Sequence, residues 1–284
     1  MPAEKLTKNE KREQAREQAR IRREEELKRK KRKSLFIKLG VLGGILAVIG
    51  IVVLVVTAPK PEPVAQSNPK NMISNGVLFD GSTTPVETPA IAKGEKATPT
   101  VPSQDKVNVA IYLDYACPYC KKFEELQAAT LKQYVERGEV ALEYHPLGFL
   151  STYSGIAANA SACIAANEPE KWWEANDMLY AAQLDEAVAQ TYSQKLSVKH
   201  IKNTWESLNL NATTSKCISD MPYLDWAANA TSEALSGPLP NSDAPKVQGT
   251  PFVIVDGKFY QVDYIQQPEA LRQIIDAALA AKKL

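Results

Sequence analysis

The chain has 284 residues and a formal net charge of +1, which is enough length for one or two ordinary domains. That average conceals two regions of opposite charge, because residues 1–34 hold 14 Lys or Arg against 7 Asp or Glu, whereas residues 58–284 hold 19 against 26. Glu residues are interleaved with the basic ones in residues 1–34, which argues against nucleic-acid binding and favours a solvated arm that lies on anionic lipid.

The segment that follows the basic arm is apolar. Residues 39–56 carry no charge over 18 positions, and the apolar stretch extends back to Leu35 across the single Lys38. At about 1.5 Å per residue, such a helix can cross a hydrocarbon core of roughly 30 Å. We predict one transmembrane helix over residues 35–57 rather than a cleaved signal peptide, because the charged region and the apolar run are both too long for one.

The orientation of this span follows from six consecutive Lys and Arg residues at positions 28–33. Basic residues beside a membrane segment stay on the cytoplasmic side, so we predict a single-pass protein of the cell membrane whose arm 1–34 is cytoplasmic. All four cysteines, at positions 117, 120, 163 and 217, then lie outside the cytoplasm, where disulfides persist. An even number suggests two pairs, although four cysteines allow three connectivities.

A stretch rich in proline, serine, threonine and lysine occupies residues 58–105. Repeated proline removes amide donors and blocks helix formation, so we predict an extended, extracytoplasmic linker. A short apolar piece at residues 76–79 is the exception, and it is expected to dock as an edge strand.

From Lys106 the pattern becomes that of an α/β domain, which we predict to extend over residues 106–284. A β-branched and aromatic strand at 107–113 leads into a Cys-x-x-Cys turn, a helix at 121–136 and a second strand at 140–144, which together form a βαβ unit. Residues 151–236 are rich in alanine and amphipathic, and they predict an inserted helical subdomain. Two strands at 251–255 and 258–262 and a helix at 268–281 complete the domain.

The Cys-x-x-Cys motif consists of Cys117, Pro118, Tyr119 and Cys120. A cysteine at the start of a helix is stabilised as a thiolate by the helix dipole and by free amide groups, so we predict that Cys117 is the nucleophile. Pro118 suits the first helical turn, and Cys120 would resolve the mixed disulfide. Half of a zinc site and a merely structural disulfide are the alternatives.

Neither alternative fits the context of the motif. A zinc site needs further ligands, and the two histidines of the chain, His145 and His200, are not at ligand spacing. A Cys-x-x-Cys in a βαβ context is typical of redox chemistry. The sequence therefore predicts a thiol-disulfide oxidoreductase with no metal and no cofactor.

These residues resemble a known family. The strand before the motif, the CPYC itself, the Lys-Lys-Phe helix after it, the helical insert and Gly249-Thr250-Pro251-Phe252 together resemble DsbA-like thioredoxin-fold proteins, in particular the membrane-anchored type of the Gram-positive envelope. The resemblance covers about residues 106–284. Glutaredoxins also have a CPYC motif, so the helical insert, the predicted location outside the cytoplasm and the Thr-Pro element are the features that distinguish this family from them.

The resemblance implies roles for four further residues. Pro251 would follow a cis peptide bond and lie against the active disulfide, although an ordinary trans proline opening an edge strand is the alternative. Thr250 could also donate its hydroxyl to the thiolate. The pair Cys163 and Cys217 would form a structural disulfide, the alternative being a pair that shuttles electrons to Cys117 and Cys120.

One position departs from the family pattern. Many thioredoxin-like proteins have a buried acid six residues before the first cysteine, where this chain has Ile111. Asp114 is the nearest upstream carboxylate, and it either relays protons for Cys120 or, as we favour, caps or orients the active-site turn.

The resemblance also implies a direction for the reaction. We expect the chain to donate the Cys117–Cys120 disulfide to exported, unfolded or reduced proteins, and to be reoxidised by a membrane partner that is quinone-linked and VKOR-like or DsbB-like. A membrane-tethered reductase, for example for cytochrome maturation, would use the same residues. A non-enzymatic binding module with this fold is the third hypothesis.

Overall fold

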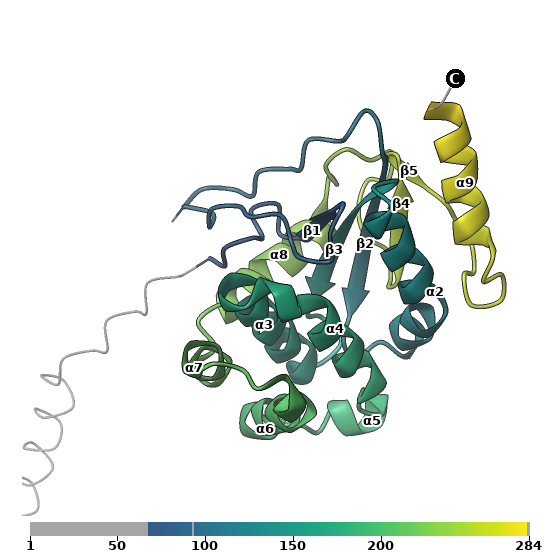
Figure 1. Ribbon diagram of the computed structural model, residues 1–284. Coiled ribbons are helices and arrows are strands. Elements are labelled where there is room, and N and C mark those ends of the chain that lie inside the picture. Colours follow the sequence, from purple (N-terminus) through teal and green to yellow (C-terminus); the bar gives the residue numbers. More distant parts are fainter. Residues whose placement is uncertain (1–67, 93, 283–284) are drawn as a thin grey trace, which may run out of the picture. The chain divides into compact units, whose positions relative to one another are not determined.

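Five strands form one mixed sheet in the order β1-β3-β2-β4-β5 in the computed structural model, which describes residues 68–92 and 94–282 (Figure 1). β2 (Val107–Asp114) runs parallel to β3 (Val140–Leu147), and the remaining neighbours pair antiparallel. The edge strands are β1 (Val77–Asp80) and β5 (Lys258–Phe259), and β4 (Phe252–Val255) lies between β2 and β5. The described residues all belong to one compact unit of the chain.

The helices α2 (Pro118–Glu136) and α9 (Ala270–Lys282) run beside the sheet, and the insert gathers at the carboxyl ends of β2 and β3 (Figure 1). The elements of the insert are α3 (Thr152–Asn167), η1 (Pro169–Lys171), α4 (Trp172–Ala181), α5 (Glu186–Ala189), α6 (Gln194–Thr204), η2 (Glu206–Leu208), α7 (Ala212–Asp220) and α8 (Leu224–Ser236). α3 is buried on nearly all sides, because α4, α6, α7 and α8 all pack against it. The insert is therefore built around one apolar helix.

Alternation along β2 separates two apolar cores. Val109 and Ile111 point to the larger core, which α2, α9 and the insert share, while Tyr112 points to a smaller core under the end of α8. Successive side chains of a strand point to opposite faces of the sheet, which produces this division. Because both faces of β2 are buried, the strand lies at the centre of the fold. The end of β2 is thus a rigid base for the residues that follow it.

The predicted linker differs from what the structure shows in its second half. Residues 71–80 pack against the domain: β1 is hydrogen-bonded to β3, Met72 is fully buried, and Asn71 donates through Nδ2 to the Ala165 carbonyl at 2.8 Å. Prolines limit local conformation, but they do not prevent an extended segment from burying its apolar side chains. The part of the predicted linker around residues 71–79 is therefore attached to the domain, and the predicted edge strand at 76–79 corresponds to β1.

The strand expected at 258–262 is also shorter than predicted. β5 ends at Phe259, and the Val262 amide instead donates to the Tyr260 carbonyl at 2.9 Å in a tight turn. The predicted transmembrane helix at 35–57 lies outside the described residues. Within residues 68–92 and 94–282, no helix is long and apolar enough to span a membrane.

Candidate active site

The Cys-x-x-Cys motif opens α2 directly beyond the end of β2. Cys117 is the N-cap residue of this helix and Pro118 its first helical residue, where the missing amide hydrogen of proline leaves no hydrogen bond unmade. The Cys117 amide donates to the Asp114 carbonyl at 3.0 Å, which closes the turn between strand and helix. Tyr119 projects outward and is 65% exposed.

The two cysteines are free thiols, and their surroundings shift their pKa values in opposite directions. A hydrogen bond from Cys120 is the main cause that lowers the pKa of Cys117 to about 6, and the Thr250 side chain and the amides of Tyr119 and Cys120 act in the same direction against burial. Burial and the neighbouring Cys117 raise the pKa of Cys120 well above its usual value. At neutral pH the pair therefore carries one thiolate, at Cys117.

Thr250 and Pro251 lie beside the nucleophile, just before β4 begins. The peptide bond between them is cis, and the Cys117 Sγ lies 3.3 Å from the Thr250 carbonyl oxygen, which accepts a hydrogen bond from Cys117 when that residue is protonated. The structure thus brings together residues that are 133 positions apart in the sequence.

Asp114 is buried beneath this turn and anchors its surroundings. Its carboxylate accepts hydrogen bonds from the amides of Ala116, Phe149 and Leu150 at 2.8 to 3.2 Å, and from the Ser154 hydroxyl at 2.6 Å. Burial raises the pKa of Asp114, while these four hydrogen bonds lower it. Because both carboxylate oxygens of Asp114 already accept hydrogen bonds, its geometry is that of a residue that orients the active-site turn rather than one that carries protons.

Comparison with known proteins places this geometry in a family. Residues 102–277 match the family model described as thioredoxin. The chain belongs to this thioredoxin family.

The relatives agree with the resemblance seen in the sequence. A probable disulfide bond formation protein D of Bacillus anthracis is 22% identical over 174 residues, which span 61% of this chain and 74% of that protein. The oxidised BdbD structure from Bacillus subtilis aligns with a TM-score of 0.52 at 17% identity, over 75% of this chain and 97% of that one. The structure of MdbA from Corynebacterium matruchotii, a thiol-disulfide oxidoreductase, aligns with a TM-score of 0.51 at 18% identity, over 71% of this chain and 91% of that one. The DsbA-like assignment is confirmed, and this member of the thioredoxin family is a thiol-disulfide oxidoreductase.

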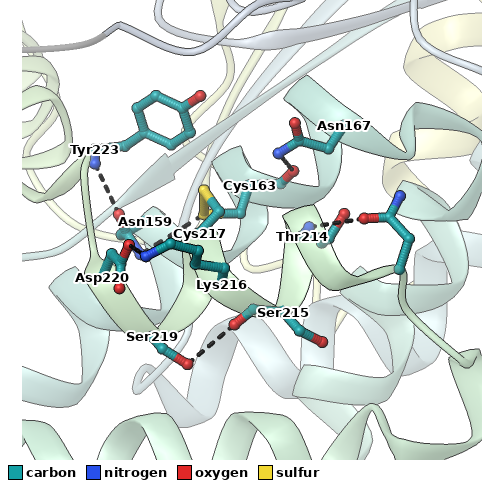
Figure 2. The surroundings of a disulfide bond; sticks show 11 residues. Asn159, Cys163, Asn167, Thr214, Ser215, Lys216, Cys217, Ser219, Asp220 and Tyr223 are labelled. Carbon is teal, nitrogen blue, oxygen red and sulfur yellow. Dashed lines mark hydrogen bonds and ion pairs between the residues drawn. A yellow bond between two sulfur atoms is a disulfide. The ribbon is translucent and has the colours of Figure 1, made fainter.

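The second cysteine pair of this thioredoxin-family chain is a disulfide within the insert. Figure 2 shows the bond between Cys163 on α3 and Cys217 on α7, with an S–S distance of 2.08 Å and Cα atoms 5.8 Å apart. Asn159, one turn before Cys163, accepts a hydrogen bond from the Tyr223 amide at 2.9 Å and so links the same region to α8. The disulfide fastens α7 to the central helix of the insert.

Two residues near the motif escaped the sequence analysis. Gln183 donates through Nε2 to the carbonyls of Tyr115 and Cys117, both at 2.9 Å, and thereby holds the active-site turn against the end of α4. Glu124 is a buried carboxyl group one helical turn beyond Cys120. Glu124 had a signal in the sequence, since it lies on the same helical face as Cys120 and Gln127, whereas nothing in the spacing of Gln183 indicates its contacts.

No other reaction centre competes with this one in the described part of the chain. A large cleft lies over β2, β4 and α9, but neither Cys117 nor Cys120 lines it. Residues 68–92 and 94–282 also contain no group of three or more His, Cys, Asp or Glu side chains placed to hold a metal ion.

The lowered pKa of Cys117 makes a prediction about its reactivity. In the reduced protein, the rate of Cys117 alkylation by iodoacetamide should rise with pH through about 6 and level off near 7, because only the thiolate reacts. Mass spectrometry of rapidly quenched samples should find Cys120 unmodified at neutral pH. A midpoint near 8.5, the value of an ordinary thiol, would contradict the proposed stabilisation.

Proposed function

We propose that this chain introduces disulfide bonds into exported proteins by exchange through Cys117. The geometry that carries the proposal is the place of Cys117 at the N-terminus of α2, where hydrogen bonds from Cys120 and from the amides of Tyr119 and Cys120 lower its pKa to about 6. A thiolate that is stable in the reduced protein favours reduction of the protein's own disulfide, so the oxidised pair readily accepts electrons from a substrate.

The reaction has two steps that balance. A substrate thiolate attacks the Cys117 sulfur, which breaks the Cys117–Cys120 bond, forms a mixed disulfide and releases Cys120 as a thiolate that takes up a proton. A second substrate thiolate then attacks the substrate sulfur of the mixed disulfide. The substrate leaves with its new disulfide, and Cys117 leaves as the stabilised thiolate.

Unfolded or reduced exported proteins are the proposed substrates. Three features of the sequence support a location at the cell membrane: the basic arm 1–34, the apolar segment 35–57, and cysteines that all follow this segment. A membrane redox partner, quinone-linked and VKOR-like or DsbB-like, would reoxidise the pair by accepting two electrons. The relatives named for disulfide bond formation support the same direction.

A refolding assay tests this direction. Reduced, unfolded ribonuclease should regain activity when it is mixed with the oxidised chain, because its thiols are oxidised in pairs. The same chain should reduce insulin disulfides only slowly with dithiothreitol as electron source. Rapid insulin reduction without oxidation of ribonuclease would favour the alternative of an envelope reductase, and inactivity in both assays would favour a binding module.

A further inference from the structure

The insert reaches the Cys-x-x-Cys motif through α4. Tyr115, two positions before Cys117, is fully buried, and three contacts hold it to this helix. Its hydroxyl donates to Asn176 Oδ1 at 2.9 Å, and its ring lies 5.0 Å from the ring of Tyr180. Its carbonyl accepts a hydrogen bond from Gln183 Nε2 at 2.9 Å. The end of β2 is therefore joined to α4 immediately before the nucleophile.

The side-chain amide of Gln183 binds two carbonyl groups of the active-site turn at once. Its Nε2 carries two hydrogens, and it donates to the carbonyls of Tyr115 and Cys117, both at 2.9 Å. At the other end of the first of these peptide groups, the Ala116 amide donates to Asp114 Oδ1 at 2.8 Å. Gln183 and Asp114 thus fix this peptide group from its two ends.

The second of these peptide groups depends on its carbonyl, because a proline follows it. The peptide group between Cys117 and Pro118 has no amide hydrogen, so only its carbonyl can be held by a hydrogen bond. That carbonyl accepts hydrogen bonds from the Lys121 amide at 3.1 Å and from Gln183. The orientation of this group sets the direction of the next two amides, which stabilise the Cys117 thiolate.

The end of α4 gives Gln183 a fixed base. The carbonyl of Ala182, the residue before Gln183, accepts a hydrogen bond from His200 Nε2 on α6 at 3.0 Å. The Ala181 carbonyl accepts one from Lys121 Nζ on α2 at 3.4 Å. The last carbonyls of a helix have no partner within it, so these contacts anchor the end of α4 to two other helices.

We propose that Gln183 is a positioning residue for the nucleophile: through two carbonyl groups it holds the start of α2 so that the free amides of its first turn face Cys117 Sγ. Without this donor the two carbonyls lose a partner, the turn can rotate, and the thiolate is less well stabilised. The inference rests on exchange at Cys117 and holds for either direction of the reaction, because the same thiolate is the nucleophile in reduction and the leaving group in oxidation.

The pH dependence of Cys117 alkylation tests the proposal. Gln183→Met keeps the length of the side chain but cannot donate a hydrogen bond. In the reduced full-length chain of this variant, the midpoint of alkylation by iodoacetamide should lie above the wild-type midpoint of about 6. At pH values below this midpoint the rate should fall about fivefold, the effect of one lost hydrogen bond, and above about pH 8 the two rates should converge.

An equilibrium with glutathione gives a second, independent measurement. The Gln183→Met variant has a less stable thiolate in its reduced form, so the equilibrium constant for reduction of its disulfide at pH 7 should fall about fourfold. Gln183→Ala, whose side chain is too short to disturb its neighbours, should give the same changes. A merely structural role would lower the melting temperature and leave both the pH midpoint and this equilibrium unchanged.

Gln127→Met is the matched control. Gln127 lies on α2, two turns beyond Cys120, and its Nε2 donates to the Pro268 carbonyl at 2.9 Å. The same substitution removes a hydrogen bond of the same kind there without touching the active-site turn. This variant should therefore keep the wild-type midpoint and the wild-type equilibrium.

The outcomes separate this inference from the proposed function. A wild-type midpoint in both Gln183→Met and Gln183→Ala, or an equal shift in Gln127→Met, would overturn the role of Gln183. If the shifts appear but the wild-type chain does not oxidise ribonuclease, the proposed direction fails while the role of Gln183 stands.

Discussion

Replacement of Cys117 by alanine is expected to reduce the rate of disulfide exchange to that of the uncatalysed reaction. Cys117 holds the stabilised thiolate and the sulfur that a substrate attacks, whereas Cys120 is buried and its pKa is raised. Removal of an enzyme's nucleophile costs several orders of magnitude in rate, and no nearby thiol can replace this one. The oxidation of a dithiol peptide, followed by mass spectrometry, measures the effect.

Cys120→Ala is the informative partner variant. Its Cys117 thiolate can still attack a disulfide and release one of its thiols, but the resolving thiol is absent, so a covalent complex with a disulfide-containing peptide should accumulate on non-reducing gels. Cys117→Ala should give no such complex. Both variants should melt as single cooperative units, and substantial exchange by a folded Cys117→Ala protein would refute the site assignment.

Loss of the Cys163–Cys217 disulfide is expected to have the largest effect on stability. The bond joins residues 54 positions apart, and closing a loop of that length stabilises the folded state by about 4 kcal/mol in the chain-entropy model. The variant Cys163→Ala/Cys217→Ala should therefore unfold at a clearly lower urea concentration. Alanine is preferred to serine because Cys163 is fully buried, where a hydroxyl without a partner is costly.

Two comparisons complete this experiment. Each single replacement should cost about as much as the double one, since either breaks the same bond. Peptide oxidation under conditions where the double variant is folded should proceed at the wild-type rate, because the disulfide lies within the insert and fastens α7 to α3. Unchanged unfolding together with lost turnover would assign the pair to electron transfer.

Local sequence patterns predicted the central elements of this fold well. The expected strand at 107–113 corresponds to β2 at 107–114, and the expected insert at 151–236 contains the helices from α3 to α8. These elements were predictable because a β-branched run or an amphipathic pattern reflects both the conformational preference of the residues and the face that they bury. The segment 68–105 was harder, because its prolines indicate extended backbone without showing that Met72 would be buried.

The sequence predicted only the part of the active site that is formed by residues adjacent in the chain. The motif itself indicated a thiolate at a helix start, but three of the four donors to Asp114 come from Phe149, Leu150 and Ser154, 35 to 40 positions later. Such contacts arise from the way β2, β3 and α3 meet, and no spacing in the sequence encodes them. Glu124 was within reach of helical periodicity, and its contact with Asn176 became evident only from the packing of α4.

The reduction potential of the Cys117–Cys120 pair tests the account most directly. It is measured by equilibrating the chain with glutathione buffers and counting alkylated Cys117 by mass spectrometry. A thiolate with a pKa of about 6 stabilises the reduced form, so a potential above about −200 mV is predicted, toward the range of strong protein oxidants. A potential below about −250 mV, in the range of thioredoxin, would contradict the proposal that this chain donates disulfides.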